Sequence, residues 1–376
     1  MPPKTPPFDP DAFISNWSRE PIVPNADRTF RDCIIQAFNL PLDDNYVYRA
    51  QGETTLEITE KAIGGKRAHG LHGWYHDEEG KPLDPPHPSP PETTSYTTLF
   101  YPSVSLPKSL SSFRASAKAQ TLRSIISTYL ESRYLNTYPP LGLIPAKKDR
   151  THTNPYLDIW TYTCHELEWA GPVPSTTYTK ISHHILPHLY HHFGCVVPSY
   201  AALYALVKIA QPAKPKENPN NLPILDIGSG TGYWTYMLRT FPLPAGAGWK
   251  PVEVRAIDNK LSTYRTSWIN DTITTSGMDY LKQQDGGKGT ILLLVYPQAT
   301  GNFTGPLLKA FRGYWIVVAG TQNGNGFTGF VDTQVEVWVE KNLKEWELVL
   351  RIPLPSFAGK DEGMFVWRRK EKVGDQ

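Results

Sequence analysis

Short apolar runs alternate with amphipathic segments along the second half of the chain. Seven of these runs have the length and composition of strands, and they cover residues 224–227, 252–257, 273–275, 291–295, 315–319, 346–352 and 364–368. Residues 331–341, between the fifth and sixth runs, are predicted to be helical. Alternation of this kind is typical of a parallel sheet whose strands are joined by crossover helices. The pattern therefore predicts an α/β fold for residues 216–376.

The middle of the chain has helical periodicity instead. From residue 111 onward, apolar residues recur at intervals of three and four. One such stripe consists of Leu122, Ile125, Ile126, Tyr129 and Leu130. Two further helices are predicted at residues 178–190, where Pro187 interrupts the pattern, and at residues 198–210. Residues 111–215 are therefore predicted to form a helical accessory region.

Clustered prolines divide residues 1–110. Five prolines within residues 1–10 prevent helix formation, so this segment is expected to be a mobile tail. Six more within residues 81–92 are typical of an extended surface connector, with a proline-rich ligand for a partner protein as the alternative. Between them, residues 27–38 are predicted to be a short helix, and the glycines in residues 46–75 indicate turns.

The composition is that of a globular protein without an overall charge bias. Of the 376 residues, 40% are hydrophobic, and 38 Lys and Arg residues nearly balance 36 Asp and Glu residues. The net charge of +2 argues against a nucleic-acid-binding tail and leaves room only for a local basic patch. Cys33, Cys164 and Cys195 are odd in number and widely spaced, so neither a disulfide framework nor a CxxC metal site is expected.

The location follows from the same features. The longest apolar runs are far shorter than the about 20 residues that cross a bilayer, and no apolar signal-peptide core stands at the N-terminus. Membrane insertion and secretion are therefore not expected. A cytoplasmic protein is predicted, and the sequence does not separate the cytoplasm from the nucleus.

One glycine-rich segment carries the sharpest chemical signal. It consists of Asp226, Ile227, Gly228, Ser229, Gly230, Thr231, Gly232, Tyr233 and Trp234. Glycine at alternate positions after a strand lets the backbone approach a ligand that a Cβ atom would exclude. A helix that follows directs free N–H groups and the positive end of its dipole at the same ligand. The segment therefore predicts a ligand site at a strand-to-helix turn.

Spacing and a second acidic residue narrow the choice of ligand. A dinucleotide-binding turn has the pattern G-x-G-x-x-G, but Tyr233 stands here in place of the last glycine. Asp258, which precedes Asn259, ends the next predicted strand, where a carboxylate can accept hydrogen bonds from both ribose hydroxyls of a nucleoside. Asp226 suits a ligand with a cationic amino acid end better than a pyrophosphate. A nicotinamide-binding Rossmann domain is the alternative.

These residues resemble motif I of class I S-adenosylmethionine-dependent methyltransferases, and the resemblance covers residues 198–370. It implies a Rossmann-like sheet of seven strands, mostly parallel with the last strand antiparallel, and an α-rich N-terminal extension. It implies S-adenosylmethionine as cofactor, S-adenosylhomocysteine as product and no metal. The helical region 111–215 would cover the acceptor pocket. The implied cofactor contacts are Asp226, Gly228, Ser229, Gly230, Thr231, Gly232, Trp234, Asp258, Asn259, Met278 and Tyr296.

Two further segments are expected to complete the site. Tyr296, Pro297 and Gln298 end the fourth predicted strand and loosely resemble the segment with which amino-methylating members of the family hold the target nitrogen. The alternative is a proline that ends the strand beside a packing aromatic residue. Met278, after the third strand, is expected to contact the adenine, with a place in the core face of the next helix as the alternative.

Other clusters of reactive residues have simpler interpretations. Five histidines lie within residues 183–192, and the spacing of His184 and His188 would suit a metal pair. No HExxH motif accompanies them, so a structural or surface cluster is favoured, with a role for His188 and His192 in the acceptor pocket as a further hypothesis. Cys164 and His165 are neighbours and would point to different faces of a helix or strand. Residues 367–372 are interpreted as a solvated basic strand end and residues 323–326 as a flexible loop.

Methyl transfer needs mainly in-line placement, because the sulfonium is already a good leaving group. The predicted function is therefore the transfer of a methyl group from S-adenosylmethionine to a nitrogen or oxygen atom of a small molecule. The alternatives are methylation of RNA or protein, and a non-catalytic module that serves as a scaffold for a partner. The identity of the acceptor and the oligomeric state do not follow from the sequence.

Overall fold

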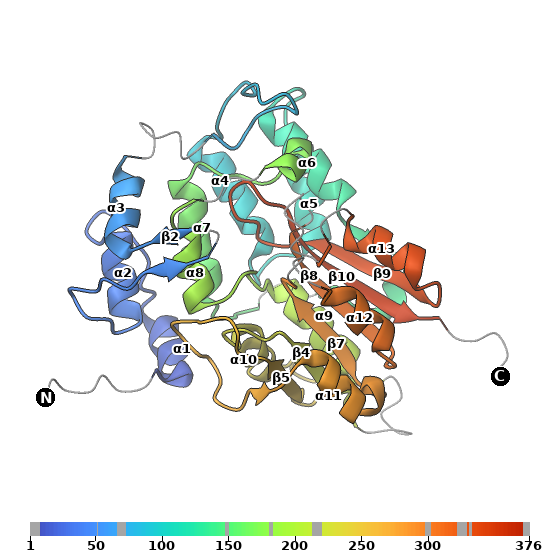
Figure 1. The fold of residues 1–376 in the computed structure, drawn as a ribbon. Coiled ribbons are helices and arrows are strands. Elements are labelled where there is room, and N and C mark those ends of the chain that lie inside the picture. Colours follow the sequence, from blue (N-terminus) through green and yellow to red (C-terminus); the bar gives the residue numbers. More distant parts are fainter. Residues whose placement is uncertain are drawn as a thin grey trace, which may run out of the picture.

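The structure is a computed structural model of the chain, and its helices and strands are drawn in Figure 1. It describes residues 8–50, 52–65, 73–146, 150–179, 183–212, 220–297, 302–321, 329–330 and 333–370. Gln298 and the predicted loop 323–326 lie outside these ranges, as do residues 1–7 of the expected tail.

One mixed sheet of eight strands organises the molecule, in the order β3-β9-β10-β8-β7-β4-β5-β6. The strands are β3 (Leu135–Asn136), β4 (Ile224–Ile227), β5 (Val254–Asp258), β6 (Ile273–Thr274), β7 (Ile291–Val295), β8 (Trp315–Thr321), β9 (Trp346–Pro353) and β10 (Glu362–Arg369). β4 to β8 form parallel pairs, whereas β10 is antiparallel to both of its neighbours. All seven apolar runs are strands. The α/β prediction is confirmed, and the sheet is consistent with a Rossmann-like fold whose eighth strand, β3, comes from the predicted helical region.

Three helices from the second half of the chain cover one face of the sheet. They are α11 (Gly277–Gln283), α12 (Thr304–Ala310) and α13 (Val335–Asn342). Their apolar residues pack against alternate strand residues, such as Leu225, Leu292 and Val318, in one buried cluster. Because side chains alternate along a strand, the residues between these point to the opposite face.

The opposite face packs against the rest of the chain. It is covered by α7 (Pro155–Glu166), α8 (Leu186–His192), α9 (Tyr200–Ala210) and α10 (Tyr233–Arg239). Ile224, Leu293 and Met364 from the sheet belong to the same buried cluster as Phe13 and Trp74 from the first 110 residues. The N-terminal region therefore shares one continuous core with the sheet.

The N-terminal elements occupy two places: those up to residue 65 lie beside α7 and α8, away from α12 and α13, whereas those of residues 106–132 lie near β9 and α13 (Figure 1). They are α1 (Pro10–Arg19), α2 (Phe30–Ala37), β1 (Tyr48–Arg49), β2 (Glu53–Thr54), α3 (Leu56–Gly64), α4 (Pro90–Thr97), α5 (Leu106–Ala115) and α6 (Leu122–Ser132). Helix α4 begins inside the predicted connector, because Ser89 and Glu92 form a capping box around Pro90 and Pro91, which are tolerated in a first turn.

Two connections differ from the sequence prediction. The predicted helix 178–190 is wrong at residues 179 and 183–185, which are not helical: α8 begins only at Leu186, because Pro187 is compatible with a first turn but not with a helix interior. The connection between β5 and β6 contains no helix and runs as a loop over residues 259–272. Trp268 of this loop packs against Phe8 and Phe13, with ring centroids 5.1 and 5.3 Å apart, so α1 and the residues before it cover the place of a crossover helix.

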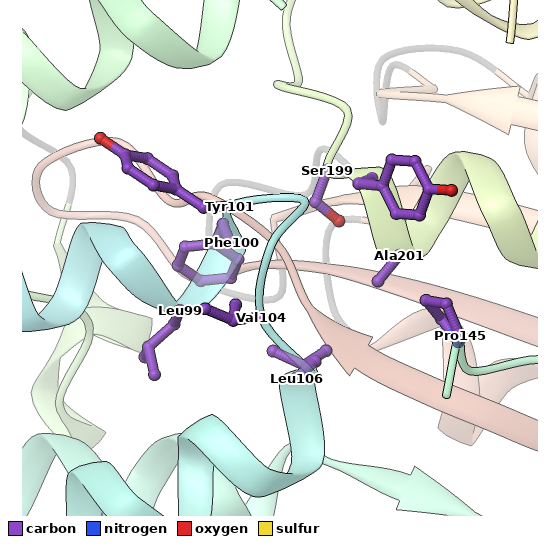
Figure 2. A pocket seen from close by; sticks show the side chains of 9 residues that line it. Leu99, Phe100, Tyr101, Val104, Leu106, Pro145, Ser199 and Ala201 are labelled. Carbon is purple, nitrogen blue, oxygen red and sulfur yellow. The ribbon is translucent and has the colours of Figure 1, made fainter. Parts of the chain in front are cut away.

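A small apolar pocket lies where α9 begins (Figure 2). Its lining includes Leu99, Phe100, Val104 and Pro145, and Ser199 and Ala201 come from the start of α9. Its volume of about 10 Å³ is at the lower limit for a single water molecule. This pocket is a packing defect and not a ligand site.

Candidate functional site

The glycine-rich segment forms the turn between β4 and α10. Gly228, Gly230 and Gly232 have φ angles of +81°, +57° and +79°, a conformation that side chains disfavour. A Cβ atom on Gly232 would lie 2.4 Å from Cγ1 of Ile269, and one on Gly230 would lie 3.2 Å from the hydroxyl oxygen of Tyr264. The glycines therefore allow the loop after β5 to approach the turn, in addition to leaving Gly228 open to solvent.

The turn lies where the strand order of the sheet reverses. The chain runs outward from β4 to β5 and β6 on one side and then crosses back to β7 on the other side of β4. In open α/β sheets, ligands bind in the crevice outside the carboxyl ends of the strands at such a point. The fold therefore brings the glycine turn, the end of β5 and the end of β7 to the same edge.

Asp258 at the end of β5 is bound directly to the glycine turn. One carboxylate oxygen, Oδ2, accepts a hydrogen bond from the Gly230 N–H at 3.0 Å, and Oδ1 accepts one from the Lys260 N–H at 2.6 Å. The side chain is half-buried, so each oxygen keeps a lone pair that can face a ligand. Asn259 is exposed, and its side chain accepts a hydrogen bond from the Leu261 N–H. The structure thus brings together the two places where the sequence predicts nucleoside contacts.

Asp226 lies beneath the turn. Its side chain is fully buried; Oδ2 accepts a hydrogen bond from the Thr235 hydroxyl at 2.6 Å, and Oδ1 has no partner among the described residues. Burial raises the pKa of this carboxyl to about 7, and the nearby Asp258 contributes in the same direction. A buried oxygen without a partner is costly, which makes Oδ1 a candidate to receive a polar group of a ligand.

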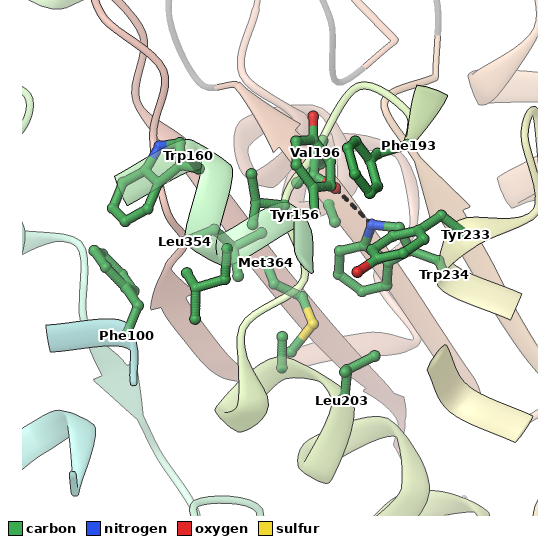
Figure 3. Close-up of a cluster of buried hydrophobic side chains, with 14 of the residues drawn as sticks. Phe100, Tyr156, Trp160, Phe193, Val196, Leu203, Tyr233, Trp234, Leu354 and Met364 are labelled. Atoms are coloured by element: carbon green, nitrogen blue, oxygen red, sulfur yellow. Dashed lines mark hydrogen bonds between the residues drawn. The ribbon is translucent and has the colours of Figure 1, made fainter. Parts of the chain in front are cut away.

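Two other predicted contacts are engaged in packing, and a third is not. The Thr231 hydroxyl donates a hydrogen bond to the Phe193 carbonyl at 2.6 Å, and the Trp234 indole donates one to the Val196 carbonyl at 2.8 Å. Figure 3 shows Trp234 and Tyr233 within the apolar cluster that joins α10 to the segment between α8 and α9. Ser229 is half-buried, and its hydroxyl has no partner among the described residues. Of this group, Ser229 alone has a side chain that can turn to a ligand.

Tyr296 directly after β7 has a strained backbone. Its φ of +52° is unusual for an aromatic residue, and strain of this kind is concentrated at functional sites. Its N–H donates to the Ala319 carbonyl at 2.7 Å, and its hydroxyl accepts a hydrogen bond from Tyr190 at 3.1 Å. Pro297 is buried, and Gln298 lies outside the described residues. The Tyr296 side chain thus faces α8, on the side of the sheet that the N-terminal half covers.

Met278 lies on α11, partly buried against the core of the opposite face. Ser276 caps this helix, and Gly277 lets it approach β4 closely: a Cβ atom there would lie 2.4 Å from Cγ2 of Ile227. The place of Met278 corresponds to the alternative of a core residue, and its contact with a nucleoside stays a prediction.

The histidine cluster holds the N-terminal region to the sheet. The His188 and His192 rings are buried and form hydrogen bonds with the Thr59 and Tyr48 hydroxyls, at 2.7 and 3.0 Å. Burial lowers the pKa of His188 to about 3 and lowers that of His192 as well, so both rings are neutral. Among the described residues, no group of three or more His, Cys, Asp or Glu side chains is arranged to hold a metal ion.

The remaining clusters are structural in their contacts. Cys164 and His165 lie on α7, where the thiol is buried and the ring is exposed. In the basic segment, Arg368 pairs with Glu347 at 2.6 Å, and the guanidinium of Arg369 lies 4.5 Å from the Trp346 ring centroid. These contacts tie the cations to β9.

Sequence reasoning missed the loop that lies over the glycine turn. Arg265 forms a partly buried ion pair with Asp44 and donates a hydrogen bond to the Tyr48 hydroxyl. The Arg265 and Thr266 N–H groups both donate to the His191 carbonyl, at 3.1 Å. These bonds hold the preceding residue, Tyr264, against Gly230. No local sequence pattern predicts the contact of Tyr264 with Gly230, because the residues that hold this loop in place are far apart along the chain.

A second missed group lies where the loop between β9 and β10 enters β10. Lys360, Asp361 and Glu362 are consecutive charged residues, yet each is only 1% exposed. Asp361 accepts hydrogen bonds from Tyr129 at 2.6 Å and from Thr321 at 3.1 Å. Burial raises the pKa of Glu362 to about 8, while burial lowers the pKa of Lys360. A run of three charges reads as a solvated surface in the sequence, so only the fold identifies it as buried.

No family model matches the chain, and no curated protein matches it. Within the described ranges, no helix combines the length and hydrophobicity that crossing a bilayer requires. The functional assignment therefore depends on the geometry of the site.

Proposed function

We propose that the protein binds S-adenosylmethionine at the glycine turn and transfers its methyl group to a nitrogen or oxygen atom of a small molecule. The observation that carries this proposal is the direct hydrogen bond between Asp258 and the Gly230 N–H at the reversal point of the sheet. It joins the residue suited to ribose hydroxyls to the turn suited to the amino acid end of the same ligand.

Each part of the turn has a separate task in this proposal. Gly228 is exposed and leaves its backbone open to the ligand, while the start of α10 supplies N–H groups. Asp258 would accept the ribose hydroxyls through its remaining lone pairs. Asp226, with one unpartnered oxygen, would attract the cationic amino group. S-adenosylmethionine supplies the reactive methyl sulfonium when it is bound.

The acceptor would lie near Tyr296. This residue ends β7 beside the turn, and α8 and the N-terminal region cover its side of the sheet. A covered site suits a small molecule better than a folded RNA or protein, and the net charge of +2 favours no polyanion.

A second candidate function is a non-catalytic module of the same fold. The observation that favours it is the position of Tyr264, whose hydroxyl lies against Gly230, where a ligand would have to approach. If this loop stayed in place, it would exclude the cofactor and leave a surface for a partner.

Calorimetric titration of the full chain with S-adenosylmethionine and S-adenosylhomocysteine separates the two functions. The first function predicts saturable binding of both compounds and a loss of about 10- to 100-fold in affinity in Asp258→Ala, because charged hydrogen bonds to the ribose are removed. Glu253→Ala, at an exposed carboxylate just before β5, is the matched control and should bind normally. Absence of binding by a protein with a normal thermal transition would support the non-catalytic module.

A further inference from the structure

The first residue of β10, directly after the loop that joins it to β9, places an unpaired carboxylate oxygen in the interior. Glu362 is 1% exposed; its Oε2 accepts a hydrogen bond from the Phe357 N–H at 3.1 Å, and its own N–H donates to the Ser356 hydroxyl at 2.8 Å. Its second oxygen, Oε1, has no partner among the described residues. Buried polar atoms nearly always have a hydrogen-bond partner in folded proteins, so the unpaired Oε1 of Glu362 requires an explanation.

A second unpaired side chain lies in the same neighbourhood. His183 is buried, and neither ring nitrogen has a hydrogen-bond partner within the described part of the chain. Its ring centroid lies 6.2 Å from that of Phe357, which is also 6.0 Å from that of Tyr190. Tyr190 in turn donates a hydrogen bond to Tyr296. The unpaired groups are thus linked through aromatic contacts to the residue that ends β7.

Glu362 lies on the same edge and the same face of the sheet as the glycine turn. It is in register with Thr321, the last residue of β8, and Tyr296 bonds to Ala319 of the same strand. Its side chain shares the face of Met364, which packs in the cluster that contains Ile224 of β4. β4 and β10 are three strand spacings apart, roughly 14 Å. The Glu362 carboxylate therefore lies at the same edge of the sheet as the proposed nucleoside position, with β7 and β8 between them.

We propose that Glu362 is the general base of the methyl transfer, a catalytic residue that takes the proton of the acceptor through Oε1. This inference rests on the proposed function and adds to it a residue outside the glycine turn. As the acceptor oxygen or nitrogen forms its bond to the methyl carbon, its proton moves to the Glu362 carboxylate. The carbon–sulfur bond breaks, its electron pair stays on sulfur, and S-adenosylhomocysteine leaves.

The environment of Glu362 suits this task. Burial raises its pKa to about 8, and the neighbouring Lys360 opposes the shift. A base with a pKa near the working pH balances the ionised fraction against proton affinity. The titratable groups that face it are Lys360 and Asp361 in its own segment, Tyr190 from α8, Tyr156 and Cys164 from α7, and Tyr96 from α4.

The test compares two nucleosides that differ where the methyl group is transferred. Sinefungin carries an ammonium group on carbon at that place, whereas S-adenosylhomocysteine carries no charge there. If Glu362 faces this place, the wild-type protein should prefer sinefungin. The preference should grow as the pH rises from about 6.5 to about 8.5, because the carboxyl ionises over that range.

The Glu362→Gln variant should reduce the affinity ratio of the two nucleosides by at least about tenfold, because a buried ion pair is lost. S-adenosylhomocysteine affinity should stay the same, which a general loss of structure would not permit. Asp361→Asn is the matched control: it changes an adjacent buried carboxylate that bonds to Tyr129 and Thr321, and it should leave the ratio within about twofold.

Each outcome separates this inference from the proposed function. A ratio that is independent of pH and unchanged in Glu362→Gln, with both nucleosides bound, would overturn the role of Glu362 and leave the cofactor site standing. Failure of the wild-type protein to bind either nucleoside would overturn both. A ratio that falls equally in Asp361→Asn would also contradict the assignment, because it would show a general field effect.

Discussion

The glycine turn and the loop between β9 and β10 lie at the same edge of the sheet but are stabilised differently. At the glycine turn, close backbone packing fixes the conformation, and Asp258 has a partner for each oxygen. Where this loop enters β10, Glu362 is buried with an unpaired oxygen, and His183, which precedes α8, is buried with two unpaired ring nitrogens. Unpaired buried atoms occur at both places, since Asp226 and Ser229 have one each at the turn. The difference is that close packing makes the turn contribute to stability as well as to binding, whereas no such packing offsets the unpaired atoms of Glu362 and His183, so we expect their value to lie in chemistry.

The largest effect on stability is expected at the glycine turn. Gly232→Ala should lower the free energy of unfolding by about 3 kcal/mol, because it adds a clash with Ile269 to the strain of a positive φ. Gly246→Ala is the control, since Gly246 has a φ of +74° with no atom within 4 Å of an added Cβ, and it should cost about 1 kcal/mol. Equal losses in urea unfolding would show that close packing at the turn is unimportant.

The next effect concerns the contacts of Arg265 with Asp44 and Tyr48, called the clamp below, which hold the loop after β5 over this turn. Asp44→Asn should lower the free energy of unfolding by about 2 kcal/mol, because it removes the charge that faces the partly buried Arg265. Asp271→Asn, in the exposed pair with Arg239, should cost less than about 1 kcal/mol. A thermal transition that is equally affected in both variants would contradict a special role for the clamp.

A pH effect is expected for the buried histidines next to the clamp. The pKa of His188 is lowered to about 3, so the unfolded chain binds a proton below about pH 6.5 that the folded chain does not. The stability of the wild type relative to His188→Gln should therefore fall by about 1.4 kcal/mol for each pH unit below about 6.5. His165→Gln, at an exposed ring, should show a weaker dependence.

The smallest effect is expected at Glu362. At about pH 4 this carboxyl is protonated in the folded and in the unfolded protein, so Glu362→Gln should change the free energy of unfolding there by less than about 1 kcal/mol. The pKa of Glu362 is raised in the folded protein, so the wild type loses stability as the pH rises from about 4.5 to about 8. Over that range the free energy of unfolding of Glu362→Gln should therefore increase relative to that of the wild type. A large loss at neutral pH would make Glu362 a structural residue and remove the contrast with the glycine turn.

Local patterns were sufficient for seven of the eight strands of the sheet and for half of the site. These seven follow from apolar runs, because strands that are buried on both faces, such as β4 and β7, must be apolar throughout. The glycine turn and Asp258 follow from spacing, because residues that end neighbouring parallel strands meet at one edge. Helix α4 escaped prediction because its prolines occupy a first turn, where they are tolerated.

The sequence by itself determined seven of the eight strands, the glycine turn and the position of both aspartates, since these depend on neighbours within a few residues. Only the tertiary structure placed Tyr264 against Gly230 and buried Glu362 beneath helices from the first half of the chain. Burial is a property of the whole packed molecule. The pKa of a carboxyl, and with it the ability to accept a proton near neutral pH, therefore becomes defined only when distant segments exclude water around it.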